Sequence, residues 1–181
     1  MRAAPWPLAL GALAFALRVP FCVSVPQDPD GARFARALLR YDLTQGHPHP
    51  PGYPLFIGLG NVVHALGPSP AWSLSAVSAL SGAVLVAIFT SWCIRRVGAA
   101  AAILGAVFLT VVPLTTTLSA RPLSDMLGAA LAWGALLSAL RTPLDARRTA
   151  GLSALVLLVR ASTFALCAPA LPRTSQTRPL L

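Results

Sequence analysis

The sequence predicts an all-α membrane protein with about five transmembrane helices and one or two interfacial helices in its first outer loop. Of the 181 residues, 56% are hydrophobic and only 10% are charged, whereas about a quarter of the residues of a soluble domain carry charge. Several runs approach or exceed the roughly 20 apolar residues that cross a bilayer. The polar residues are gathered between those runs, and residues 27–54 alone hold three of the five acidic side chains.

The expected spans follow from these runs. The first follows Arg2, and we expect it to be retained because no small-x-small cleavage site precedes the polar interval; a cleaved signal peptide is the alternative. The second is uncharged until Arg95–Arg96, the fourth has Asp125 in its first turn, and the fifth has Arg160 at mid-length. The predicted spans are residues 6–25, 72–94, 97–118, 122–140 and 149–171.

The outer loop, residues 26–71, is expected to hold surface helices. Pro26 and Pro29 stop the first span, and Asp30 stands where an N-cap is expected. The following residues have helical periodicity up to Gly46, with Phe34, Ala35, Leu38, Leu39 and Tyr41 on one side and Arg33, Arg36 and Arg40 on the other. Such a helix would lie on the membrane surface. Residues 54–66 predict a second helix that is too short to cross.

Positive charge sets the expected orientation. Arg95–Arg96 and the loop from Arg141 to Arg148 are separated by two spans, so they share a side, and arginine marks that side as cytoplasmic. The N-terminus is then cytoplasmic and the outer loop extracytoplasmic, as expected in the plasma (inner) membrane of a bacterium. The polar tail, residues 172–181, indicates that the chain stops before the fold does.

The composition excludes some functions. The net charge of +9 comes from dispersed arginines, so we expect no nucleic-acid partner. Cys22, Cys93 and Cys167 lie in apolar runs and are expected to act as small hydrophobic residues. His47 and His49 form a histidine pair, but only the distant His64 could join them, whereas zinc generally takes three or four protein ligands. We therefore expect a structural turn and no metal there.

Two short motifs carry a resemblance. The segments DGARFA (30–35) and HPPGYPLF (49–56) resemble the GT-C integral-membrane glycosyltransferases, and most closely the bacterial protein O-mannosyltransferase-like group of family 39. The resemblance runs from about residue 6 to residue 171. It implies transfer of a sugar from a polyprenyl-phosphate-linked donor to an acceptor hydroxyl at the extracytoplasmic face. Full-length relatives continue with further spans, so the resemblance also implies a truncated chain.

The resemblance implies that Asp30 is the base that takes the acceptor proton. A helix N-terminus and Arg33 favour its ionised form; a purely structural N-cap is the alternative, and Asp28 is expected to be a turn residue. Asp125 is expected either to orient the acceptor, to bind a divalent cation or to be an interfacial anion, with Arg121 beside it as a pairing partner.

The other candidates would bind substrate. Arg160 suits the phosphate of a lipid carrier, because a charge within a span normally faces a cavity or a partner; the alternative is that the fifth span is misplaced and Arg160 reaches the interface. Tyr53 and His49 could contact the sugar, although an interfacial aromatic residue and a packed turn are the simpler interpretations. The sequence identifies no definite cofactor, a divalent cation stays an alternative, and metal dependence is left open. A non-catalytic multi-span protein and an inactive gene fragment are the rival hypotheses, and the sequence leaves the oligomeric state open.

Overall fold

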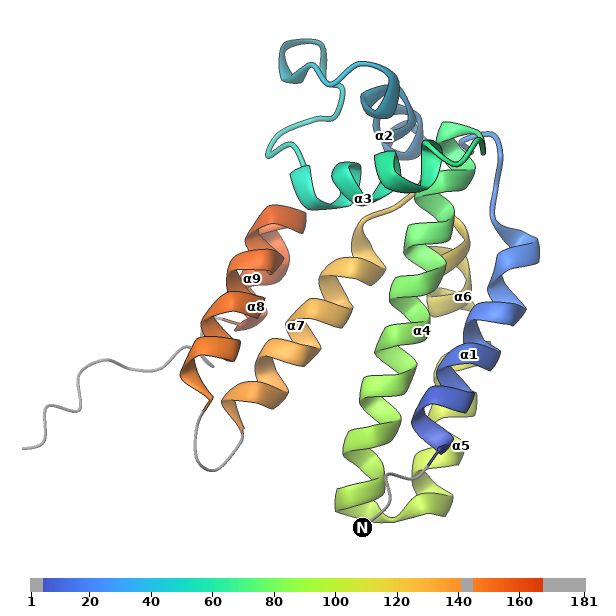
Figure 1. Ribbon diagram of the computed structural model, residues 1–181, viewed down its shortest axis with the longest axis vertical. Helices are drawn as coiled ribbons and strands as arrows, with labels where there is room; N and C mark the ends of the chain where they lie inside the picture. The colour runs from blue at the N-terminus through green and yellow to red at the C-terminus, as the bar shows by residue number, and fades with distance from the viewer. Residues whose placement is uncertain (1–4, 141–144, 168–181) are drawn as a thin grey trace, which may run out of the picture.

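The structure is a computed structural model that describes residues 5–140 and 145–167, and in these parts all regular secondary structure is helical (Figure 1). The predicted all-α class is therefore confirmed. Two short 3-10 helices occur, η1 (Val19–Phe21) and η2 (Leu43–Gln45). The α-helices are α1 (Trp6–Arg18), α2 (Pro29–Leu39), α3 (Pro54–His64), α4 (Pro70–Val97), α5 (Ala99–Val111), α6 (Pro113–Ala120), α7 (Asp125–Ala139), α8 (Ala146–Val159) and α9 (Ala161–Cys167).

Helix α4 is the centre of the fold. It has 28 residues, so it is about 42 Å long, and α1, α2, α3, α5, α6 and α7 all pack against it. Several small residues of α4 are buried where these helices approach it, among them Ser75, Ser78, Ser81 and Gly82. At Gly82 a Cβ would clash with the Ser119 hydroxyl of α6, so this close approach requires glycine.

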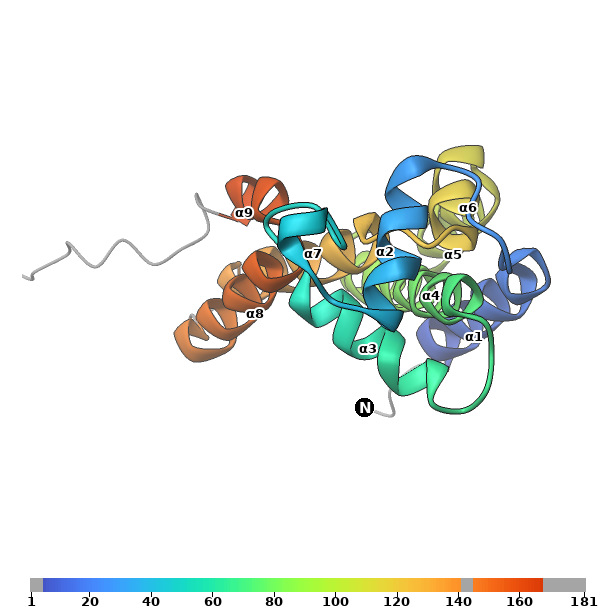
Figure 2. The same ribbon diagram turned by 90° about the horizontal axis from the view of Figure 1, so that it is seen from above.

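Helices α2 and α3 lie across one end of the bundle, which Figure 2 shows from above. The C-terminal end of α4 and the N-terminal end of α8 lie at the opposite end (Figure 1). These two ends carry Arg95–Arg96 and Arg147–Arg148. The arginine segments therefore share one end of the molecule, as the sequence predicted, and the polar loop lies at the other.

Membrane association is supported chiefly by α4. Among the described residues, α4 alone is a single helix long and apolar enough to cross a membrane. Helices α5 and α6 pass the same test together but are bent by 56° at Pro113. Three shorter apolar helices accompany them, over Trp6–Phe21, Pro54–His64 and Asp125–Ala139. The fuller set of five spans stays a prediction.

Several predicted helix ends differ from the structure. Within the predicted span 6–25, α1 ends at Arg18 and η1 at Phe21, after which the chain is extended at Cys22, in keeping with the prolines there. Helix α2 ends at Leu39 and not at Gly46, because the backbone of Arg40 is extended. Gly46 instead ends η2, with a φ of 69°. Helix α3 matches the predicted second helix to within two residues.

The predicted fifth span is interrupted. Helix α8 ends at Val159, Arg160 has an extended backbone with φ −161° and ψ 107°, and α9 begins at Ala161. Arg160 is therefore not at the middle of a continuous helix. Residues 168–171 of the predicted span and the tail 172–181 lie outside the described residues.

Candidate active site

The loop that joins α2 to α3 has a defined conformation. The Thr44 hydroxyl donates to Asp42 Oδ1 at 2.6 Å, and the backbone N–H groups of Thr44 (3.0 Å) and Gln45 (3.3 Å) donate to the same oxygen. These hydrogen bonds, that of the Thr44 hydroxyl most of all, lower the pKa of the Asp42 carboxyl group. The Tyr41 hydroxyl donates to the carbonyl of Gly52 at 3.0 Å. Gly52 has a φ of +100°, and a Cβ there would clash with the Tyr41 hydroxyl, so glycine is needed. The peptide bonds His47–Pro48 and Pro50–Pro51 are cis.

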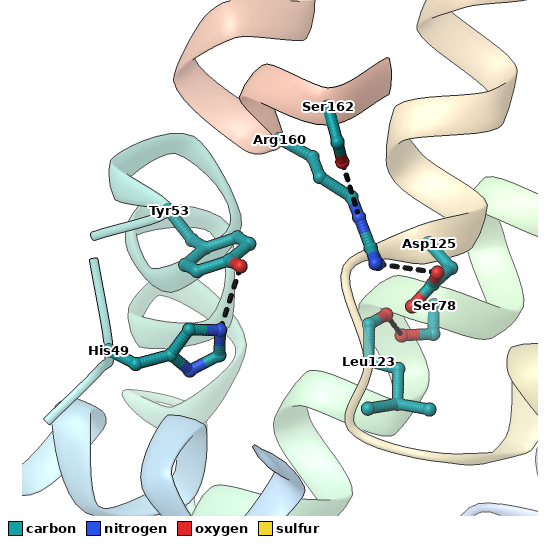
Figure 3. A network of polar contacts seen from close by, with 7 residues as sticks. All are labelled: His49, Tyr53, Ser78, Leu123, Asp125, Arg160 and Ser162. Atoms are coloured by element: carbon teal, nitrogen blue, oxygen red, sulfur yellow. Dashed lines mark hydrogen bonds and ion pairs between the residues drawn. The ribbon is translucent and has the colours of Figure 1, made fainter. Parts of the chain in front are cut away.

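Tyr53 stands at the end of this loop in a left-handed conformation, with φ 50° and ψ 46°. A non-glycine residue in this region carries about 1–3 kcal/mol of strain. Its ring is 7% exposed and packs edge-on against Phe34, with ring centroids 4.8 Å apart. Its hydroxyl lies 2.8 Å from His49 Nε2 (Figure 3). Packing and this hydrogen bond thus hold Tyr53 in its strained position.

The Tyr53 phenol is held in its protonated form. Burial has the largest effect on the pKa of this phenol and raises it. The positive charge of Arg160 lowers this pKa, and the negative charges of Asp30 and Asp125 raise it. The hydrogen bond between this hydroxyl and His49 Nε2 leaves the other ring nitrogen, Nδ1, on the side of Asp30. That nitrogen lies 3.8 Å from Asp30 Oδ1. Asp30, His49 and Tyr53 are therefore neighbours, but only His49 and Tyr53 are hydrogen-bonded, and His49 Nδ1 has no hydrogen-bond partner among the described residues.

Asp30 is not the helix cap that the sequence suggested. Asp28 is the N-cap of α2, since its Oδ1 accepts the Gly31 N–H at 2.7 Å, and Pro29 occupies the first helical position, which suits proline. The carboxylate of Asp30 is 55% exposed and lies 3.8 Å from Arg33 Nη1. Because Asp28 caps the helix, the Asp30 carboxylate is not used in capping and is accessible to an incoming molecule.

Asp125 and Arg160 form the second pair of the site. Asp125 begins α7, as predicted, and Arg160 Nη1 donates to its Oδ1 at 2.5 Å. Arg160 Nε also donates to the Ser162 hydroxyl at 3.1 Å, and both charged side chains are about one-third exposed. The break between α8 and α9 thus places Arg160 beside Asp125. Arg121, the partner expected from the sequence, makes no ion pair in the described parts of the chain.

Helix α4 holds the segment that precedes Asp125. The Ser78 hydroxyl donates to the carbonyl of Leu123 at 2.7 Å, as well as to Leu74 in its own helix (Figure 3). At Gly31, a Cβ would lie 2.8 Å from the Pro122 side chain. The start of α2 and the start of α7 are therefore packed together, which brings Asp30 and Asp125 to the same end of the bundle.

The polar groups rest on an apolar cluster. Phe34, Tyr53, Phe56, Ile57 and Leu74 belong to one buried core, with Leu123 and Leu127 packed against it. This core joins α2, α3, α4 and α7, so the elements that carry His49, Tyr53, Asp30 and Asp125 form a single packed unit.

All six site residues predicted from the sequence lie at this end. Asp30 contacts Arg33 and His49, His49 contacts Tyr53, and Asp125 contacts Arg160. The two groups lie at the same end of the bundle (Figure 3), and among the described residues no hydrogen bond or ion pair joins one group to the other. The sequence did not predict the pairing of His49 with Tyr53 or the Ser78 contact. No set of three or more metal-binding side chains occurs in the described residues.

The fold and this site define a class: an all-helical, membrane-associated protein with carboxylate, imidazole, phenol and guanidinium groups gathered at one end. Comparison with protein-family models matches residues 40–146 to the "Protein O-mannosyl-transferase TMEM260 N-terminal domain". The match covers more than half of the chain, and the chain belongs to this family. It is thereby related to protein O-mannosyltransferases, while the finer resemblance to bacterial family 39 stays a prediction.

The matched segment includes His49, Tyr53 and Asp125, whereas Asp30, Arg33 and Arg160 lie outside it. Searches of curated proteins and of solved structures each found no significant match.

Proposed function

We propose that this protein is a membrane glycosyltransferase, or a part of one, that transfers a sugar from a polyprenyl-phosphate-linked donor to an acceptor hydroxyl at the extracytoplasmic face. The family relationship supports mannose as the sugar to test first and a protein hydroxyl as the acceptor. The observation that carries the proposal is the convergence of Asp30, His49, Tyr53, Asp125 and Arg160 from separate segments.

The chemistry needs a base beside the acceptor. The acceptor oxygen attacks the anomeric carbon from the face opposite the phosphate, the bond from that carbon to the phosphate oxygen breaks, and the polyprenyl phosphate leaves with the bonding electrons. Asp30 takes the acceptor proton, which typically contributes about 10² to 10⁴-fold to the rate. Its exposure and its freedom from capping suit this role.

His49 and Tyr53 position this base. His49 Nδ1 lies 3.8 Å from Asp30 Oδ1, and the hydrogen bond with the Tyr53 hydroxyl holds the other ring nitrogen at 2.8 Å. The buried Phe34 ring packs against both of these rings. The imidazole therefore has one preferred orientation, which limits the positions of the carboxylate.

Arg160 is the proposed partner of the donor phosphate. Its guanidinium uses Nε and one Nη in the hydrogen bonds described above and keeps further N–H donors. Asp125 neutralises its charge while the site is empty and fixes its position. A phosphate bound by two oxygens matches the planar fork of arginine better than the single ammonium of lysine.

The membrane supplies the setting for a lipid-linked donor. Helix α4 can cross a bilayer by length and composition, and large apolar side chains such as Leu8, Leu104 and Leu114 are exposed on the bundle. The arginine-rich end favours a cytoplasmic location. In this orientation the site faces outward and the N-terminus lies in the cytoplasm, as expected for an inner-membrane protein.

The test is a transfer assay with the full chain in proteoliposomes, using polyprenyl phosphate that carries radiolabelled mannose and a serine- and threonine-containing peptide. We expect Asp30→Asn to lower kcat by roughly 10² to 10⁴-fold while donor binding is kept. Asp145→Asn is the matched control, because Asp145 caps α8 at the other end and asparagine caps a helix about as well.

Two outcomes would count against the proposal. Full activity in Asp30→Asn would reject the assignment of the base. Donor binding without any transfer by the unaltered chain would favour a non-catalytic membrane protein. Arg160→Lys separates the roles further: we expect weaker donor binding, seen as a higher KM, because the charge stays but the fork is lost.

A further inference from the structure

A cavity with a mainly apolar lining and several polar groups lies away from the candidate active site, between the end of α1 with η1 and the ends of α5 and α6. Its volume is about 490 Å³, within the range of small-molecule sites. Its polar walls include Arg18, Gln27, Thr117 and Arg121, and its apolar walls include Leu17 and Phe21. No residue assigned to the candidate active site lines it.

Arg18 is the unusual group in this cavity, because it is a charge that is only 2% exposed. Its Nη1 donates to the carbonyl of Ala14 at 2.9 Å and its Nη2 to that of Leu109 at 3.2 Å. Its Nε has no hydrogen-bond partner. Burial of a charge without a counter-charge costs several kcal/mol, so Arg18 is poorly satisfied by the protein alone.

No acidic residue is available to neutralise Arg18. All five aspartates of the chain lie in the described residues, and each caps a helix or pairs with another arginine. Asp28 and Asp145 cap helices, whereas Asp30, Asp42 and Asp125 pair with other arginines. The cavity therefore contains positive charge without a counterion from the described chain.

Arg121 adds a second guanidinium. It is the C-terminal cap residue of α6, is partly exposed, and makes no side-chain hydrogen bond or ion pair within residues 5–140 and 145–167. The Thr117 hydroxyl and the Gln27 amide, also on the wall, make no hydrogen bond there either. Two arginines with free N–H donors suit an anion with several oxygens, since charge-assisted hydrogen bonds are about twice as strong as neutral ones.

The apolar walls indicate what carries the anion. Leu17 is 50% exposed and Phe21 is 71% exposed, so an apolar surface adjoins the arginines. A ligand with a phosphate group and an acyl chain would cover both surfaces. We propose that this cavity binds a phosphate group, and that Leu17 and Phe21 contact the acyl chain of the phospholipid that carries it. The proposal does not depend on the transferase activity.

The test uses the purified full chain in a non-ionic detergent, titrated calorimetrically with short-chain phosphatidic acid, with the matching diacylglycerol and with inorganic phosphate. We expect phosphatidic acid to bind and diacylglycerol not to bind. Arg121→Gln should weaken binding by roughly tenfold to a hundredfold, the range expected for a lost hydrogen bond to a charged group. Arg96→Gln should leave the binding of phosphatidic acid unchanged, because Arg96 is exposed in the last turn of α4 and does not line the cavity.

The inorganic phosphate arm distinguishes the source of the anion. Binding of inorganic phosphate as tight as that of phosphatidic acid would support the phosphate site and identify soluble phosphate as a sufficient ligand. Because Arg18→Gln alters a buried residue and can unfold the chain, Arg121→Gln carries the test. Binding of neither ligand, or equal binding of phosphatidic acid by wild type and Arg121→Gln, would overturn the proposal.

Discussion

The contact between α2 and the segment before α7 can be tested by adding one methyl group. In Gly31→Ala the new Cβ would lie 2.8 Å from Pro122 Cγ and 3.3 Å from both Asp28 carboxylate oxygens. Neither neighbour can withdraw easily, since the proline ring is buried and Asp28 caps the helix. Overpacking of this kind costs about 1–3 kcal/mol.

Gly58→Ala is the matched control, because Gly58 lies in α3 and a Cβ there meets nothing within 4 Å. Alanine is favoured over glycine inside a helix by about 0.8–1.0 kcal/mol, so this variant should be stabilised. At about 2–4 °C per kcal/mol for a chain of this size, we expect Gly31→Ala to melt several degrees below Gly58→Ala. Thermal unfolding in detergent, followed by circular dichroism, measures the difference.

The Gly31 variant also has a functional readout. Separation of α2 from Pro122 moves Asp30 relative to Asp125, so we expect transfer activity to fall while Gly58→Ala keeps it. Equal melting temperatures for the two alanine variants would refute the packing of α2 on Pro122, and with it the joint placement of the two carboxylates.

Two further predictions concern the groups around the site. Ser78→Ala removes the donor to the Leu123 carbonyl and should cost about 0.6–1.7 kcal/mol in unfolding experiments. Ser81→Ala, which loses only a bond within its own helix, should cost less, and equal losses would contradict the role of Ser78. The pKa of Tyr53 is raised above its ordinary value of 10.0, so the folded state holds the phenolic proton more tightly than the unfolded state does. The free energy of unfolding should therefore fall as the pH rises above 10.0 and through the higher pKa of the folded state. Tyr53→Phe has no phenolic proton and should lack this decrease. An identical pH dependence of the two proteins would contradict the assignment of the decrease to Tyr53.

The main helices could be predicted from the sequence because local signals mark them. Helix α4 is an uncharged run between Pro70 and Arg95, and α3 begins with Pro54 and ends near Gly67. Local residues also mark the start of α2, although its capping residue is Asp28 in place of the expected Asp30. In the run Asp28–Pro29–Asp30, proline at the first helical position makes the preceding aspartate the cap.

The break at Arg160 could not be predicted in the same way. Hydropathy treats residues 149–171 as one run, and the charge of Arg160 was the one local sign that this span could be misplaced, without locating a break in the helix. The ion pair with Asp125, 35 residues earlier, lies beside the extended backbone of Arg160. Such a contact depends on tertiary packing, which local periodicity does not reveal.

The candidate site was predicted by residue type but not by arrangement. Leu39 illustrates the limit for surface helices: periodicity put it on the same apolar side as Phe34, and Leu39 is 71% exposed whereas Phe34 is buried. His49 and Tyr53 lie in a proline-rich segment without periodicity, so their hydrogen bond follows from the loop conformation. Asp30, Asp125 and Arg160 were noted separately, and their roles stay predictions.

The tight packing around α4 has a consequence for how this sequence can vary. Its buried face consists mainly of alanine, serine and glycine, and six other helices approach it closely. Apart from Ser78, whose hydroxyl bonds to Leu123 in another segment, the serine hydroxyls on this face matter less than the volume of each side chain. A saturation scan of α4 should therefore show a size ceiling on this face, with exchanges among small residues accepted and leucine or phenylalanine rejected, while Leu80 and Val84, which are exposed, tolerate large replacements.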